Sequence, residues 1–291
     1  MTEVETLLEA AAAAACDESA TPAERAQMLM ELAMGLQRRP KTAEHMRSAV
    51  RLYGKALALC PAEEPLLAAR IAARRATALQ ALPDGGNAFI EEARAALEGT
   101  IPVLQRHGTP VELAEAEMNL GLCLQYLGRI REAIAAYQRA LRTFDAKRYP
   151  AEFAILQSNL ATAFLAVGSP LSEGLAVKAF EEGLRAVNLI DHPAEYAMLQ
   201  NNLGNALQSV ASSHAVDNHV RALAAYDEAL KVRMPESRPM EYANTLANKA
   251  NCLWTLGRIE EAKAAYIEAR EVFLSHGEDA KARAVLEAMG G

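Results

Sequence analysis

Six prolines recur at near-regular intervals along the chain, and a similar apolar pattern follows each of them. They are Pro22, Pro65, Pro110, Pro150, Pro193 and Pro239, with spacings of 43, 45, 40, 43 and 46 residues. A repeat of this length is typical of a stack of small units, each too thin to bury its own apolar face. The sequence therefore predicts a solenoid of repeats, an architecture that usually serves as a binding surface.

The residues after each proline follow the pattern of an amphipathic α-helix. A polar residue lies nine positions on, mostly Leu comes next, and then a strictly small residue: Ala33, Ala76, Gly121, Ala161, Gly204 or Ala250. A small residue on the apolar face lets another helix approach closely. Proline suits the first turn of a helix, and Thr21 with Glu24 and Thr109 with Glu112 have the spacing of capping boxes.

A second helix is predicted in every unit, with one large side chain between two small ones on the same face. The six copies are Ala49/Tyr53/Ala56, Ala93/Leu97/Thr100, Ala133/Tyr137/Ala140, Ala176/Phe180/Gly183, Ala222/Tyr226/Ala229 and Ala262/Tyr266/Ala269. We interpret these large side chains as core residues set between close-packed helices.

The turns inside the last four units differ in length and carry the length variation of that half of the chain. They are predicted at 128–130, 168–174, 209–220 and 257–259. The turn at 209–220 is expected to be the longest and most mobile. Its two histidines, His214 and His219, are interpreted as solvated loop residues rather than metal ligands.

Composition and charge exclude several classes of partner. Hydrophobic residues make up 51% of the chain but aromatic residues only 5%, as in closely packed helices. The formal net charge is −7 with no long basic run, so neither nucleic acid nor an anionic membrane surface is an expected partner.

The four cysteines contain no CxxC pair. Cys123 and Cys252 occupy the repeat position that holds Gly or Ala in the other copies, so they are interpreted as small core residues. The acidic N-terminus lacks the pattern of a signal peptide, and no apolar run reaches membrane-spanning length. These features favour a cytoplasmic protein.

Two segments carry a family resemblance. NLGLCLQYLGRIREAIAAYQRAL at 119–141 and NKANCLWTLGRIEEAKAAYIEAR at 248–270 resemble tetratricopeptide repeats, and units such as PAEYAMLQNNLGNAL at 193–207 are similar to the longer repeats of kinesin light chains and bacterial multi-repeat proteins. The resemblance covers about residues 22–275 and implies an all-α, right-handed solenoid of about six helix pairs. We place these at 21–62, 64–107, 109–147, 149–190, 192–234 and 238–275, with capping helices in 1–20 and 277–291.

The resemblance also implies that the first helices line a concave groove. The predicted partner-binding residues are side-chain amides and the single tryptophan: Asn119, Asn159, Asn201, Asn202, Asn205, Asn244, Asn248, Asn251, Gln125, Gln208 and Trp254. An amide both donates and accepts, so it can hold the backbone of an extended peptide. Two alternatives stay open: the asparagines join neighbouring repeats, and Trp254 packs in the core.

Arg70 and Arg74 lie one helical turn apart and form a candidate anion-binding spot. A carboxylate clamp of the chaperone-binding type would need basic and Asn residues from three successive repeats. Glu31 at the corresponding place in the preceding repeat opposes a bound carboxylate, so we expect no such clamp. Pairing of the two arginines with Glu31 is the alternative.

No nucleotide loop, nucleophile elbow, metal-binding HExxH or paired-carboxylate motif occurs, so we predict a non-enzymatic protein without cofactor or metal. One hypothesis is an adaptor, scaffold or assembly chaperone that holds a protein or peptide. The other is a regulatory receptor whose superhelix responds to a peptide or small ligand. Self-association through the solenoid ends is a further expectation.

Overall fold

In the computed structural model, residues 3–38, 40, 42–82, 86–210 and 215–290 are described, and they form fourteen α-helices. The helices are α1 (Glu3–Cys16), α2 (Pro22–Arg38), α3 (Ala43–Leu59), α4 (Pro65–Gln80), α5 (Gly86–His107), α6 (Pro110–Tyr126), α7 (Ile130–Ala140), α8 (Pro150–Val167), α9 (Pro170–Ala186), α10 (Pro193–Ser209), α11 (Ala215–Leu230), α12 (Pro239–Thr255), α13 (Ile259–Ser275) and α14 (Asp279–Gly290). The predicted all-α fold of paired helices is confirmed.

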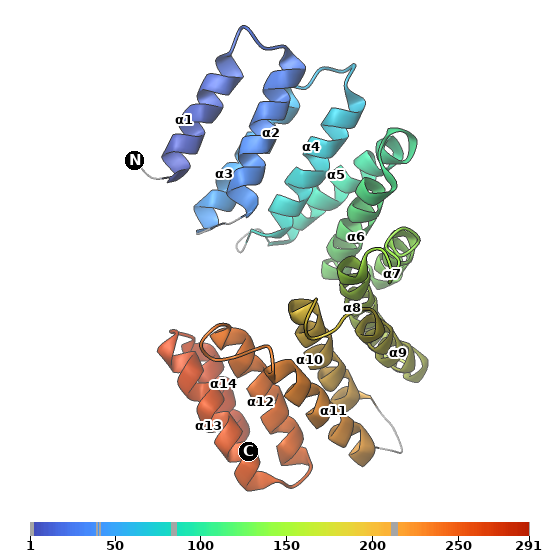
Figure 1. The fold of residues 1–291 in the computed structure, drawn as a ribbon, viewed down its shortest axis with the longest axis vertical. Coiled ribbons are helices and arrows are strands. Elements are labelled where there is room, and N and C mark those ends of the chain that lie inside the picture. Colours follow the sequence, from blue (N-terminus) through green and yellow to red (C-terminus); the bar gives the residue numbers. More distant parts are fainter. Residues whose placement is uncertain (1–2, 39, 41, 83–85, 211–214, 291) are drawn as a thin grey trace. The chain divides into compact units, whose positions relative to one another are not determined.

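The helices divide into two compact units, which comprise residues 1–143 and 144–291. In unit 1, α2 packs on α3, α4 on α5 and α6 on α7, and α1 lies against α2. In unit 2, α8 packs on α9, α10 on α11 and α12 on α13, and α14 lies against α13 (Figure 1). The first helices of successive pairs also touch, α2 to α4 to α6 in unit 1 and α8 to α10 to α12 in unit 2. Each unit therefore brings its first helices to one side.

All six repeat prolines stand at the first residue of a helix, as predicted. The capping box at Thr109 is complete: its hydroxyl accepts from the backbone N–H of Glu112, and the Glu112 carboxylate accepts from the backbone N–H of Thr109. Thr21 and Glu24 make the same reciprocal pair. These contacts satisfy backbone donors that the helix itself leaves unpaired, and so they determine where the helices begin.

In each helix pair, the large side chain predicted for the second helix is buried between the two helices. Tyr53, Tyr137, Phe180 and Tyr226 are almost completely buried, and the small residues that flank them on the helix are buried as well. A Cβ added at Gly121 would overlap the Tyr137 ring, and one at Gly204 would lie 2.6 Å from Cε1 of Tyr226. The small position of the first helix is therefore the place where the ring of the second helix is seated.

Two of the predicted turns are shorter than expected. The turn predicted at 168–174 spans only Gly168 and Ser169, because Ser169 caps a helix that begins at Pro170. Helix α11 begins at Ala215, so the prediction of a turn to residue 220 is wrong, and His219 is helical, with its Nδ1 2.6 Å from the Ala215 carbonyl. His214 lies outside the described residues. The turns at 128–130 and 257–259 are confirmed.

None of the helices in the described part of the chain combines the length and apolarity that a membrane crossing requires.

Replacing Gly204 with Ala should lower the free energy of unfolding by about 1–3 kcal/mol, because the new methyl group would collide with the Tyr226 ring. Gly99→Ala is the matched control, since nothing lies within 4 Å of its added Cβ and the residue is exposed in the interior of α5. That control should raise the free energy of unfolding by about 0.5–1 kcal/mol through helix propensity. Urea denaturation measures both changes, and a Gly204→Ala protein as stable as the wild type would contradict this packing.

The buried thiols should be inert in the native protein. Burial raises the pKa of Cys123 to about 12 and the pKa of Cys252 to about 11, so at pH 8 both are protonated as well as inaccessible. Iodoacetamide should therefore label Cys16 and the half-buried Cys60 in the native protein, and all four thiols only after unfolding. Mass spectrometry of the labelled peptides reads this out, and rapid labelling of Cys123 would contradict the structure.

Candidate binding site

In unit 2, several predicted binding asparagines are hydrogen-bonded to one another across successive repeats. The Asn202 side-chain amide donates to the Ser158 hydroxyl at 3.2 Å, which joins α10 to α8. The Asn248 amide donates to the Asn201 carbonyl oxygen at 3.4 Å, which joins α12 to α10, and Asn201 donates to Asn202 at 3.1 Å. We refer to Ser158, Asn201, Asn202 and Asn248 as the amide chain. It provides the contacts expected of residues that join neighbouring repeats.

Other predicted binding residues accept or donate hydrogen bonds at the hydroxyls of the buried tyrosines. Tyr137 donates to Gln125 at 2.8 Å, and Tyr53 donates in the same way to Gln37, which was not among the predicted residues, at 2.7 Å. Tyr226 donates to Asn205 at 2.7 Å and also contacts Gln208, while Tyr266 donates to Asn251. A buried hydroxyl without a partner is costly, so each tyrosine needs a polar residue from the first helix of its own pair.

Sequence reasoning missed this pairing, although the sequence contains a signal for it. Where the second helix carries Tyr137, the first helix carries Gln125; where it carries Phe180, which has no hydroxyl, the equivalent first-helix position is Leu165. The second unit departs from this pattern, because Gln80 occurs there with Leu97 and donates to the Asn119 backbone carbonyl instead. Comparing the two helices of each unit, rather than the six copies of one helix, would have indicated the pairing in the first, third and fifth units.

Four predicted residues remain outside these networks. Asn244 is exposed and Asn159 half-buried, and neither side chain makes a hydrogen bond within the described residues. Asn119 lines a cavity of unit 1 with its side chain, while its backbone carbonyl accepts from Gln80 at 3.2 Å. Trp254 is half-buried against the core, its ring centroid 6.4 Å from that of Tyr266. A role of these residues in partner binding stays a prediction.

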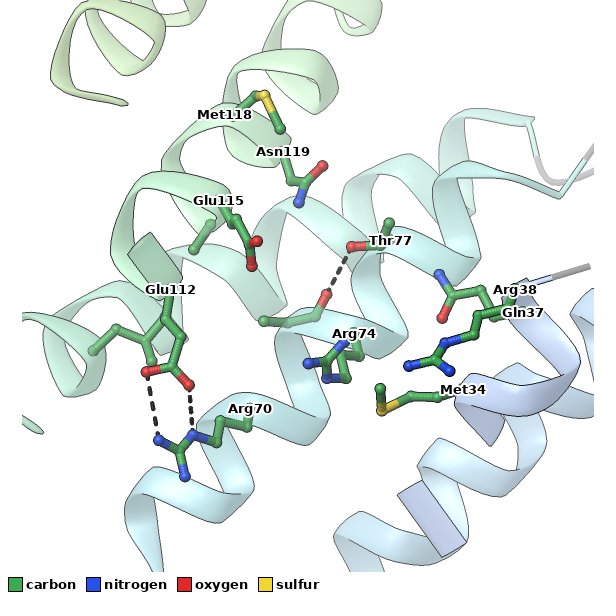
Figure 2. A pocket seen from close by; sticks show the side chains of 13 residues that line it. Met34, Gln37, Arg38, Arg70, Arg74, Thr77, Glu112, Glu115, Met118 and Asn119 are labelled. Atoms are coloured by element: carbon green, nitrogen blue, oxygen red, sulfur yellow. Dashed lines mark hydrogen bonds and ion pairs between the residues drawn. The ribbon is translucent and has the colours of Figure 1, made fainter. Parts of the chain in front are cut away.

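Unit 1 contains a cavity of about 570 Å³, lined mainly by α2, α4 and α6 (Figure 2). Because the first helices of three successive pairs touch in order, their side chains converge on this hollow. Its uncharged lining includes the flexible, apolar Met34 and Met118 and the polar Thr77 and Asn119. The volume falls within the range of about 300–1,000 Å³ found for ligand sites in proteins.

Among the residues that the structure describes, five charged ones line this cavity: Arg38, Arg70, Arg74, Glu112 and Glu115. Three guanidiniums and two carboxylates leave a net charge of +1, in a chain whose overall charge is −7. The cavity is thus locally positive on an acidic protein.

Arg70 is paired within the cavity. Its Nε donates to Glu112 Oε1 at 2.6 Å and its Nη2 to Oε2 at 3.5 Å, a two-pronged contact between α4 and α6 (Figure 2). The expected pairing with Glu31 is therefore wrong: the partner comes from the following repeat, not from the preceding one. Glu31 instead accepts from Gln27 on its own helix at 3.2 Å.

Glu112 performs two structural tasks at once, because it also completes the capping box of α6. Burial by itself would raise its pKa, but the hydrogen bonds from Arg70 and Thr109 outweigh burial and hold the pKa below its ordinary value. A carboxyl with a lowered pKa stabilises the folded state above its ordinary pKa of about 4.3 and loses that effect as the pH falls further. The link between α4 and α6 is therefore intact at neutral pH.

Arg38 and Arg74 are the cavity arginines that remain available to a ligand. Both are exposed, both extend into the cavity in Figure 2, and neither makes an ion pair or hydrogen bond to any residue that the structure describes. Burial raises the pKa of Tyr53 to about 12, and the Arg74 charge opposes that rise, which places this guanidinium within electrostatic reach of the phenol. Of the two arginines of the predicted anion spot, Arg74 thus differs from Arg70 in being unpaired.

Within the described ranges, no three His, Cys, Asp or Glu side chains gather in the manner of a metal site.

Truncating Asn202 should destabilise the protein relative to truncating Asn244. Both changes remove Asn from a helix interior and gain similar helix propensity, but only Asn202→Ala breaks the amide chain, so the two variants should differ by about 0.5–1.5 kcal/mol in unfolding free energy. Chemical denaturation followed by circular dichroism measures this difference. Equal stability of the two variants would show that the amide chain does not join the repeats energetically.

Comparison with known proteins identifies the repeat type in two segments of the chain. Residues 114–143 and 243–272 each match a sequence model of the tetratricopeptide repeat. Comparison with curated protein sequences finds no match.

Several solved structures share the architecture. BtubC (BKLC) from P. vanneervenii superposes with a TM-score of 0.59 at 18% identity, over 86% of this chain and 92% of that one. PilF from Pseudomonas aeruginosa gives 0.58 at 17% identity, over 85% and 91%. A putative kinesin light chain from Podospora anserina with nearly identical repeats gives 0.55 at 18% identity, over 74% and 98%.

These likenesses establish the fold, and the two matched segments establish the type of repeat. Such repeats are generally protein-interaction modules and are typically non-catalytic. The chain therefore contains tetratricopeptide repeats at 114–143 and 243–272, within an all-α solenoid fold of helix pairs.

Proposed function

We propose that this protein is a non-enzymatic interaction module that holds an extended segment of a partner protein, and that its main contact lies in the cavity of unit 1. The cavity supports this proposal because three successive first helices contribute to it, so one segment can touch three repeats at once. It also combines apolar, amide and charged groups, the mixture that ligand sites in proteins typically present.

The amide chain of unit 2 offers fewer free groups to a partner. Asn201 and Asn202 each donate and accept one hydrogen bond within the chain and Asn248 donates one, so part of the hydrogen-bonding capacity of these amides is already used between repeats. A hydrogen bond that replaces another contributes little net free energy. We therefore place the stronger contact in unit 1, where Arg38, Arg74 and the Asn119 side chain have no such competing partners.

The expected affinity is modest. A few amide hydrogen bonds contribute about 0.5–1.5 kcal/mol each, and ordering a flexible peptide opposes them. Contact with Met34 and Met118 adds apolar burial, because the thioether side chain adapts to the shape of its neighbour. Together these contributions correspond to dissociation constants near ~1 μM, or about −8 kcal/mol.

Filling the cavity should abolish this binding. Ala73 lines the cavity on α4, and Ala73→Phe would occupy the space that a partner side chain needs. Ala224→Phe is the matched control, because Ala224 is exposed on α11 in unit 2. Random dodecapeptides would be selected on the full-length wild-type protein, and their affinities for the three proteins measured by fluorescence anisotropy.

We expect selected peptides with micromolar affinity, about ten-fold or more weaker on Ala73→Phe and unchanged on Ala224→Phe. Helical content measured by circular dichroism should be the same in all three proteins. Equal affinities for the wild type and Ala73→Phe would contradict the proposal, as would a selection that enriches no peptide on the wild type.

A further inference from the structure

We infer that the cavity of unit 1 recognises side-chain carboxylates of an acidic segment, and that Arg38 and Arg74 are the residues that bind them. This inference rests on the proposed function and names the chemistry of the segment. It starts from a difference among the three cavity arginines: Arg70 is neutralised by Glu112, whereas the other two have no described ion-pair partner.

Because Glu112 is paired with Arg70, it does not neutralise Arg38 or Arg74. Glu112 is held by two contacts from Arg70 and by the capping box of α6, so it is not free to turn toward Arg74. The pair also keeps the Glu112 carboxylate ionised at neutral pH, because its pKa is lowered. The cavity therefore presents the available guanidiniums of Arg38 and Arg74 together with the Glu115 carboxylate, and these three groups carry a net charge of +1.

Guanidinium groups favour carboxylates for geometric reasons. Each presents a planar fork of N–H donors that matches the two oxygens of a carboxylate and forms charge-assisted hydrogen bonds. Arg38 lies on α2 and Arg74 on α4, so the two donors belong to successive repeats. An extended segment with two separated Asp or Glu residues can reach both, while its apolar side chains lie against Met34 and Met118.

The negative net charge of the whole chain strengthens the contrast with the positive cavity. A net charge of −7 repels acidic segments from most of the surface, so a locally positive cavity both attracts such a segment and directs it to one place. Exposed ion pairs are individually weak and are screened by salt. The arginines should therefore decide which peptide binds and how salt affects it, while the apolar contacts add affinity.

The test uses the full-length protein and the random dodecapeptide selection described above. The decisive variant is Arg38→Gln with Arg74→Gln. The matched control is Arg106→Gln with Arg131→Gln, which changes the net charge equally at two exposed arginines of unit 1 that do not line the cavity. Selected peptides are also resynthesised with Gln for Glu and Asn for Asp, and separately with an amidated C-terminus.

Wild-type selections should be enriched in Asp and Glu. Affinity should fall about ten-fold in the cavity variant and in the Gln and Asn peptides. The affinity of the wild-type protein for the acidic peptides should also fall when NaCl is raised from 50 to 300 mM, and that of the cavity variant should change less. The control variant and the amidated peptides should bind as the wild-type pair does. Arg38→Lys with Arg74→Lys should restore part of the affinity, because it restores the charge without the fork.

Three results would overturn the inference: selected peptides without an acidic excess, unchanged affinity of the cavity variant, or loss of binding on amidation alone, which would assign the site to a terminal carboxylate. Failure of the proposed function looks different, since no peptide would then be selected or Ala73→Phe would bind normally. Peptides that Ala73→Phe excludes but that need no acidic residue would leave the proposed function standing and remove this inference.

Discussion

The packing of one large buried side chain, a ring in five of the six helix pairs and Leu97 in the other, is the contact on which each pair depends. In the third repeat the Tyr137 ring lies against Gly121, and in the fifth the Tyr226 ring lies against Gly204, where even a methyl group would not fit. When a tyrosine ring is buried this deeply, its hydroxyl is buried too and requires a hydrogen-bond partner. The packing constraint thus extends from the core to the polar face of the first helix.

This requirement explains why sequence reasoning predicted the fold better than the candidate site. The helix starts followed from proline chemistry and capping boxes, and the core followed from the alternation of small and large residues, both of which depend only on local spacing. The role of Gln125 depends on a tyrosine in the other helix of its pair, and the partner of Arg70 comes from the next repeat. Spacing along one helix contains no information about such contacts.

The lengths of two turns were predicted wrongly for a different reason. The turn predicted at 168–174 ends early because Ser169 and Pro170 form a helix start before Gly174. His219 was predicted to lie in the turn at 209–220, whereas the structure includes it in the first turns of α11. Polar composition alone does not distinguish a loop from an exposed helix end.

The two units use polar side chains on their first helices in different ways. In unit 2, an amide-to-hydroxyl hydrogen bond joins α10 to α8 and an amide-to-amide hydrogen bond joins α12 to α10, so the polar groups contribute to the stacking of the repeats. In unit 1, an ion pair between Arg70 and Glu112 and a hydrogen bond from the Gln80 amide to the Asn119 backbone carbonyl join α4 to α6. Two further guanidiniums remain in an open cavity. This difference is the reason for assigning partner binding to unit 1.

Hydrogen–deuterium exchange of the full-length protein, with and without a selected peptide at saturation, tests that assignment most directly. The account predicts slower exchange in the segments of α2, α4 and α6 that line the cavity, and no change in α10 and α12. Protection of α10 and α12 with unchanged exchange in α4 would contradict it and move the partner to the amide chain.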